Sequence, residues 1–268
     1  MTQKNIFTFV NVLIIGGLLL TGCKPFTTQP TGLPQGAGNE WHLVVIGESS
    51  SWGLGEAYAS QIEKDLGIKV ILDDFAIGDL RAIAVLEALR TGKSSNSRLE
   101  QLPAALKQAD MVVMSASPYG SVTPETRKSI ERCFSSLEPA PCTPQGLEGF
   151  TADLQAIWAI IFELREGRPT ILRGIDAASP FVSSWKKYQV YDACTVCWEE
   201  YSEASRRAAE AYHIPFLSRY DAFNGLEHDE DLSQKGYAGS DGIHPNDLAS
   251  QLTAELLSKL GYEPVPPP

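Results

Sequence analysis

The sequence predicts an α/β fold in which a mostly parallel, doubly wound sheet lies between two layers of helices. Two observations lead to this prediction. Short apolar runs alternate along the chain with longer segments in which apolar residues recur every three or four positions, as expected for strands that alternate with helices. One run, at 111–115, is apolar up to its last residue, which is typical of a central parallel strand buried on both faces.

The predicted elements follow each other in regular order after residue 40. Each expected strand is a short apolar run, and each expected helix carries the helical repeat of apolar residues. Gly67 and Gly92 stand where two of the helices should end, as C-capping glycines do. In chain order the elements are strand 42–46, helix 54–66, strand 68–72, helix 82–89, strand 111–115, helix 154–161, strand 170–173, helix 201–211, strand 214–217 and helix 248–256.

The N-terminus has the features of an exported protein. Lys4 precedes an apolar run at 10–20, which is shorter than the roughly 20 residues that span a membrane and is typical of a signal peptide. The run ends in Leu-Thr-Gly-Cys23, which resembles the bacterial lipobox. We therefore expect residues 1–22 to be a signal peptide and Cys23 to carry a lipid anchor outside the cytoplasm. A buried N-terminal helix, or a plain signal peptide with an incidental cysteine, is the alternative.

The rest of the chain is expected to form one domain. Residues 23–40 are rich in Pro, Gly, Thr and Gln and are predicted to be a flexible tether. The domain is placed at 41–262, and 263–268 form a Pro-rich tail. The net charge is −11, and removal of residues 1–22, in which Lys4 is the only charge, changes it to −12. This charge argues against nucleic acid as a partner. No metal or organic cofactor is implied, since no ligand cluster or phosphate-binding glycine loop is found.

Four cysteines remain when Cys23 is set aside. An even number in an oxidising compartment indicates disulfide bonds. Nearest-neighbour pairing, which closes two short loops, is preferred among the three possible connectivities. A redox or zinc role for the Cys-x-x-Cys motif is less favoured because no second ligand pair accompanies it. The cysteines are Cys133, Cys142, Cys194 and Cys197.

Polar segments follow the first three predicted strands, at the edge of the sheet where functional groups gather in such folds. They are GESSSWG (47–53), DFAIGD (74–79) and SASPYGS (115–121). Near the C-terminus, SDGIHPND (240–247) holds Asp241 and His244 just before the last helix. A serine nucleophile needs an imidazole base and a carboxylate that orients it, and this turn can supply both. The other histidines have ordinary explanations: His42 lies in a strand, His213 ends a helix, and His228 is expected to be solvated.

These motifs together resemble the SGNH (GDSL-like) hydrolase family. The match runs in motif order over the whole predicted domain; DGIHPN is its most specific part, and Glu48 replaces the family's aspartate. The resemblance implies a flavodoxin-like fold and ester hydrolysis. It makes Ser49 the nucleophile, His244 the general base and Asp241 the orienting acid.

It also places the backbone N–H groups of Ser49 and Gly78 in the oxyanion hole. The alternative for Ser49 is a polar turn residue between a strand and a helix. Ser50 and Ser51 are expected to satisfy free N–H groups at the helix start. Trp52 either packs over the site or belongs to the core.

One position departs from the family pattern. The family has an asparagine after the third strand that donates to the oxyanion, whereas this chain has SASPYG (115–120). Ungapped spacing puts Tyr119 at the asparagine position, and a small shift puts Ser117 there. The hydroxyl of either residue could replace the amide.

The substrate is left open among carbohydrate O-acetyl esters, small acyl esters and lysophospholipids. Tyr119, Trp185, Tyr188 and Tyr191 could offer aromatic surfaces, or could simply pack. The segment 180–197 is predicted to be a long irregular loop, either substrate-facing or merely packed on the domain. Two other functions remain: a surface binding lipoprotein without useful catalysis, supported by the missing asparagine, and an O-acyltransferase that shares the acyl-enzyme.

Overall fold

The computed structural model describes residues 39–268. The expected signal peptide, Cys23 and most of the expected tether therefore lie outside the described residues. Between residues 39 and 268, no helix is long enough and apolar enough to cross a membrane.

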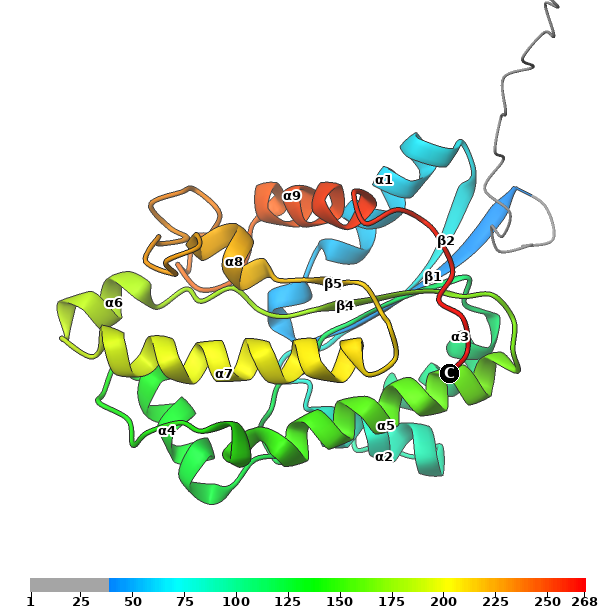
Figure 1. The fold of residues 1–268 in the computed structure, drawn as a ribbon. Coiled ribbons are helices and arrows are strands. Elements are labelled where there is room, and N and C mark those ends of the chain that lie inside the picture. Colours follow the sequence, from blue (N-terminus) through cyan, green and yellow to red (C-terminus); the bar gives the residue numbers. More distant parts are fainter. Residues whose placement is uncertain (1–38) are drawn as a thin grey trace, which may run out of the picture. The chain divides into compact units, whose positions relative to one another are not determined.

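A five-stranded, all-parallel sheet forms the centre of the domain (Figure 1). The spatial order is β2-β1-β3-β4-β5, so the chain adds β2 on one side of β1 and then crosses to the other side for β3. This confirms the predicted α/β fold with a doubly wound sheet between helices. The strands are β1 Glu40–Gly47, β2 Lys69–Ala76, β3 Met111–Met114, β4 Ile171–Ile175 and β5 Phe216–Leu217.

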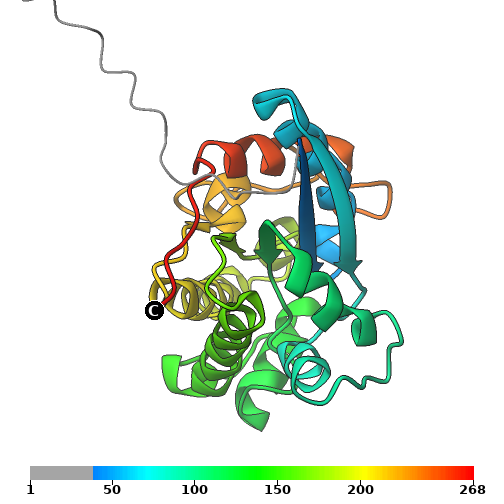
Figure 2. The same ribbon diagram turned by 90° about the vertical axis from the view of Figure 1, so that its right-hand side faces the viewer.

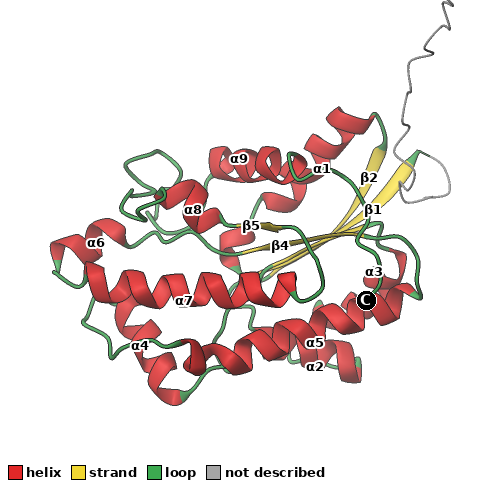
Figure 3. Cartoon of the chain, in the orientation of Figure 1, coloured by secondary structure: helices red, strands yellow, loops and turns green. Residues whose placement is uncertain are grey.

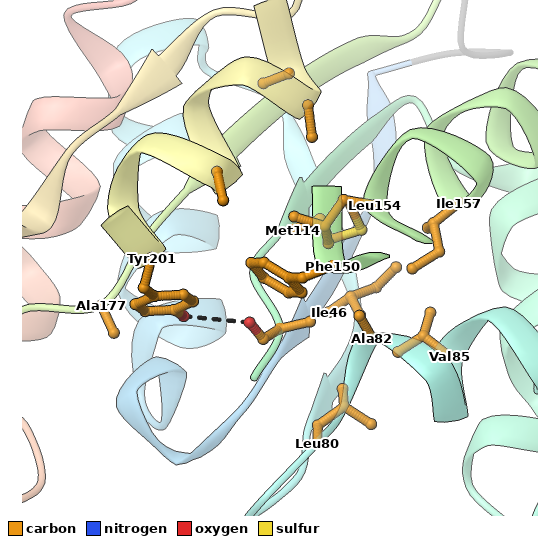
Figure 4. Close-up of a cluster of buried hydrophobic side chains, with 14 of the residues drawn as sticks. Ile46, Leu80, Ala82, Val85, Met114, Phe150, Leu154, Ile157, Ala177 and Tyr201 are labelled. Atoms are coloured by element: carbon orange, nitrogen blue, oxygen red, sulfur yellow. Dashed lines mark hydrogen bonds between the residues drawn. The ribbon is translucent and has the colours of Figure 1, made fainter. Parts of the chain in front are cut away.

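Helices cover both faces of the sheet (Figures 1 and 2). One face packs against α1 (Leu54–Leu66) and α9 (Asp247–Ser258). The other face packs against α2 (Ala82–Thr91), α3 (Leu102–Gln108), α5 (Glu148–Arg165) and α7 (Tyr191–Glu210). Successive side chains of β1 point to opposite faces of the sheet. Leu43 and Val45 belong to the apolar cluster on the side of α1 and α9, the first cluster, and Val44 and Ile46 to the cluster on the other side, the second. Figure 4 shows part of the second cluster, where Phe150 and Leu154 of α5 lie beside Met114 of β3.

Four helices were not predicted from the sequence: α3, α4 (Pro124–Phe134), α6 (Val182–Lys187) and α8 (Arg219–Asn224). The helix α4 is mostly polar, so the apolar repeat is weak, but its start is encoded: the Thr123 side chain accepts from the Thr126 N–H, and Pro124 opens the helix. The expectation of an irregular segment at 180–197 is wrong, because that stretch forms α6 and the first turns of α7 (Figure 3).

The four cysteines form two disulfides, but the preferred pairing is wrong. Cys133 bonds Cys194, and Cys142 bonds Cys197, at sequence separations of 61 and 55. The prediction treated 194–197 as a loop, whereas both cysteines lie on the buried face of α7, one turn apart. Cys194 therefore faces α4, and Cys197 faces the segment that follows α4. A single disulfide that closes a loop of this length stabilises the folded state by about 4 kcal/mol, because it lowers the conformational entropy of the unfolded chain.

Candidate active site

Residues singled out in three distant parts of the sequence meet at the carboxyl edge of the sheet. Ser49 follows β1, Ser117 and Tyr119 follow β3, and His244 precedes α9; all four line one pocket of about 280 Å³. The pocket lies where the order of the sheet changes direction between β1 and β3, which is the usual place for a ligand site in such folds.

The serine triplet forms a 3₁₀ turn, Ser49–Ser51, immediately after β1. Gly47 is required just before it, since a Cβ there would lie only 2.4 Å from the Ser51 Cβ. The Glu48 carboxylate closes the turn by accepting the Ser50 N–H at 2.8 Å and also accepts the Ser50 hydroxyl. The expected capping role of Ser50 and Ser51 is therefore wrong, because the Glu48 side chain accepts the free N–H of Ser50 in their place. The Ser51 hydroxyl is buried against that of Ser115, at 3.2 Å.

Asp241 and His244 form a compact pair. Asp241 Oδ1 accepts the backbone N–H of Ile243 at 2.9 Å and of His244 at 3.0 Å, while Oδ2 lies 2.6 Å from His244 Nδ1. These contacts, above all the one with the imidazole, hold the pKa of Asp241 well below its usual range. An ionised Asp241 keeps the proton on Nδ1 and leaves Nε2 free to accept another.

Trp52 packs on this pair. Its ring stacks on the His244 imidazole with centroids 4.6 Å apart, and its side chain is 44 % exposed. Of the two expectations for Trp52, packing over the site is confirmed and a core position is not. The stacking restricts rotation of the imidazole.

Ser49 and His244 share the pocket without bonding each other in this structure. The Ser49 hydroxyl instead faces Glu48, with its oxygen 3.5 Å from Oε2. Bonds between a nucleophile and its base are commonly long without substrate and tighten in the complex. The arrangement therefore brings a hydroxyl and an oriented imidazole to one cavity.

The two backbone N–H groups that the resemblance assigns to the oxyanion hole are not engaged elsewhere. Among the described residues, neither the Ser49 N–H nor the Gly78 N–H has a hydrogen-bond partner. Ser117 is held by its backbone, which bonds Leu80 at 2.8 Å and Ala82 at 3.1 Å.

Tyr119 is half-buried, and burial raises the pKa of its phenol, which keeps it a neutral donor. Both expected replacements for the asparagine thus lie on the pocket.

Sequence reasoning missed a buried network behind the serine turn. Arg219 lies just after β5 and donates to the Ser50 carbonyl at 2.5 Å, the Ser50 hydroxyl at 2.6 Å and the Asp176 carbonyl at 2.5 Å. The Asp176 carboxylate, just after β4, accepts the Arg219 N–H at 2.5 Å and the hydroxyls of Ser218 and Ser202. Burial raises the pKa of Asp176 and lowers that of Arg219. Asp176 and Arg219 follow β4 and β5, at the same edge of the sheet as Ser49. Because functional groups gather at the carboxyl ends of parallel strands, the order of the strands in the sequence also points to these two residues.

Two further expectations concern residues outside the pocket. His228 is not solvated: its ring bonds Glu199 at 3.1 Å and Asp221 at 2.8 Å and stacks on Tyr220. Among the aromatic candidates, only Tyr119 lines the pocket, whereas Trp185 is buried and Tyr188 is exposed elsewhere.

Comparison with solved structures agrees with this architecture. The lipase Lip_vut3 from a goat rumen metagenome superimposes with a TM-score of 0.56 at 19 % identity, over 83 % of this chain and 98 % of that one. An acetyl xylan esterase from Geobacillus stearothermophilus gives 0.54 at 12 %, over 83 % and 95 %. A lipase/acylhydrolase from Enterococcus faecalis gives 0.50 at 13 %, over 82 % and 94 %. The chain thus has the fold of SGNH-like esterases and lipases.

No protein-family model matches the sequence. No curated protein is similar enough in sequence to count as a relative.

The buried network yields a prediction about stability. Arg219→Ala leaves the carbonyls of Ser50 and Asp176 without their donor and removes the positive charge beside the buried Asp176 carboxylate, so we expect the free energy of unfolding to fall by about 3–5 kcal/mol. Arg127→Ala, which removes an exposed arginine of α4 paired with Glu131, should change it by about 1 kcal/mol or less. Urea unfolding of both variants measures the difference. Equal, small losses would show that Arg219 does not support the turn.

Proposed function

We propose that the protein is a serine esterase that hydrolyses a carboxylic ester through an acyl-enzyme on Ser49. The observation that carries the proposal is the shared pocket, which is lined both by Ser49 and by His244, whose imidazole is oriented by Asp241 at 2.6 Å. A polar turn residue needs no such partner. The fold, which esterases and lipases share, supports the same conclusion.

In the proposed reaction, Ser49 Oγ attacks the ester carbonyl carbon while its proton moves to His244 Nε2. The carbonyl π-electrons move onto the oxygen, where the N–H groups of Ser49 and Gly78 stabilise the negative charge. Collapse of this intermediate breaks the bond to the alcohol oxygen, which takes the proton from His244. Water then attacks the acyl-enzyme by the same route, and the carboxylic acid leaves while Ser49 regains its proton. Asp241 stays ionised throughout and stabilises the imidazolium.

The proposal includes a location. The signal-peptide pattern of residues 1–22 and the lipobox-like ending at Cys23 support an extracytoplasmic lipoprotein held at the membrane by a lipid. The two disulfides between α4 or its following segment and α7 agree with an oxidising compartment.

Labelling with a fluorophosphonate probe tests the nucleophile. We expect the full chain to form one covalent adduct, which peptide mapping places on Ser49. Ser49→Ala should abolish labelling and His244→Ala should slow it at least 100-fold, because the hydroxyl then lacks a base.

Ser60→Ala, on the exposed face of α1, and His213→Ala are the matched controls and should retain labelling, since both residues lie outside the pocket. Lack of labelling in a folded, disulfide-intact sample would rule out the esterase and favour a binding protein.

Two variants decide which hydroxyl replaces the family's asparagine. Removing an oxyanion donor lowers kcat by about 10²–10³, so either Ser117→Ala or Tyr119→Phe should show this loss with little change in KM. The other variant should stay within a few-fold of the parent. If both remain near the parent in steady-state ester hydrolysis, the two backbone N–H groups act without a side-chain donor.

Membrane fractionation tests the location. In a bacterial host, the full chain is expected in the membrane fraction and in the detergent phase on phase separation. Cys23→Ser removes the only thiol at the lipobox and should move the protein out of that phase. A Cys23→Ser variant that partitions like the parent would contradict the anchor.

A further inference from the structure

The walls of the pocket differ on its two sides. On the side of the turn before α9, the lining consists of His244, which is only partly buried, and the adjacent Ile243. On the other side, α4, the segment after β4 and α7 supply a continuous apolar surface. Its main members are Ile130, Cys133, Phe134, Ala177, Pro180 and Trp198.

On the apolar side, the polar atoms of the Trp198 and Tyr201 side chains are already used. The Trp198 indole N–H donates to the Ala177 carbonyl at 2.8 Å, and the Tyr201 hydroxyl donates to the Ala116 carbonyl at 3.2 Å (Figure 4). These rings therefore offer the pocket apolar surface without free donors. A sugar placed there would lose hydrogen bonds to water and regain few, so the chemistry of this wall fits a hydrocarbon group.

The position of the wall relative to the reacting groups identifies which part of an ester it contacts. The leaving alcohol must take its proton from His244, so it lies on the His244 side, beside Trp52. The acyl carbon bonded to Ser49 then points away from the imidazole, toward α4 and α7. The apolar wall is on the acyl side.

The wall is also held in place. Cys133 and Cys197 both line the pocket, and their bonds to Cys194 and Cys142 fasten α4 and its following segment to α7. Phe134, next to Cys133, is 41 % exposed at the pocket and packs edge-on against Phe181 at 5.0 Å and Trp198 at 5.5 Å. A fixed wall of this kind limits the length of the group that it can accept.

We propose that this α4–α7 wall is an acyl-binding subsite that selects an apolar acyl group of about six to eight carbons, or one with a single aromatic ring, over acetyl. This inference rests on the proposed esterase function. The cavity of about 280 Å³ far exceeds an acetyl group, and an apolar cavity of roughly 150 Å³ already takes up benzene. Phe134 and Ala177 determine the selectivity, Phe134 at the exposed edge and Ala177 after β4.

The test is a series of p-nitrophenyl esters with the full chain, from acetate through butyrate, hexanoate and octanoate to laurate, with phenylacetate added. We expect kcat/KM to rise about fourfold per methylene that enters the pocket, to reach its maximum at hexanoate or octanoate and to fall at laurate. Acetate esters of longer alcohols should show no such rise. A rise with alcohol length instead would overturn the assignment to the acyl side.

Variants with matched controls test the wall itself. Phe134→Ala and Ala177→Leu should each lower the octanoate-to-acetate ratio of kcat/KM at least tenfold, the first by removing contacts and the second by filling the cavity. Phe162→Ala and Ala211→Leu, which lie outside the pocket, should leave that ratio unchanged. Ratios that do not respond to Phe134→Ala and Ala177→Leu would overturn the proposal.

Fluorophosphonate labelling in the same samples separates the two levels of the proposal. Labelling at Ser49 together with a preference for acetate would overturn the subsite and leave the esterase intact. Absence of both labelling and hydrolysis would overturn the esterase, and the subsite with it.

Discussion

All five strands run in the same direction, and this constraint decides where the functional groups can lie. A parallel sheet delivers every strand end to one edge, where the next segment must turn away into a helix. Ser49, Gly78, Ser117 and Asp176 each follow a different strand and therefore meet at that edge. Because β2 and β3 lie on opposite sides of β1, the segments that follow β1 and β3 leave room between them for a cavity.

The same edge also concentrates buried polar groups, and these need partners. The Asp176 carboxylate accepts the backbone N–H groups of Arg219 and Tyr220 at the start of α8, and the Arg219 side chain donates to the Ser50 carbonyl in the serine turn. A buried network is stabilising only when all its members are paired. The pairing therefore leaves the turn little freedom, which is what a nucleophile requires if it is to meet a substrate without further rearrangement.

The two sides of the pocket have different physical origins. The side with His244 is a short turn built by the Asp241 carboxylate from local hydrogen bonds, and it stays open to solvent. The side with Phe134 and Trp198 is made by α4 and α7, which the Cys133–Cys194 disulfide joins, while Cys142–Cys197 joins the segment after α4 to α7. In the proposed reaction, proton transfer takes place on the first side and the acyl group lies against the second.

The sequence by itself determined the alternation of strands and helices, the motif around Ser49 and the pair of Asp241 and His244. These depend on local properties: apolar periodicity, capping glycines and a three-residue spacing that places a carboxylate beside an imidazole.

Tertiary structure decided the disulfide pairing, the apolar wall and the contact of Arg219 with Ser50, which are 169 residues apart. Those features join segments whose distance in space follows only from how the helices pack. A Cys-x-x-Cys motif, for example, looks the same in sequence whether it closes a loop or, as here, turns two side chains of one helix toward another segment.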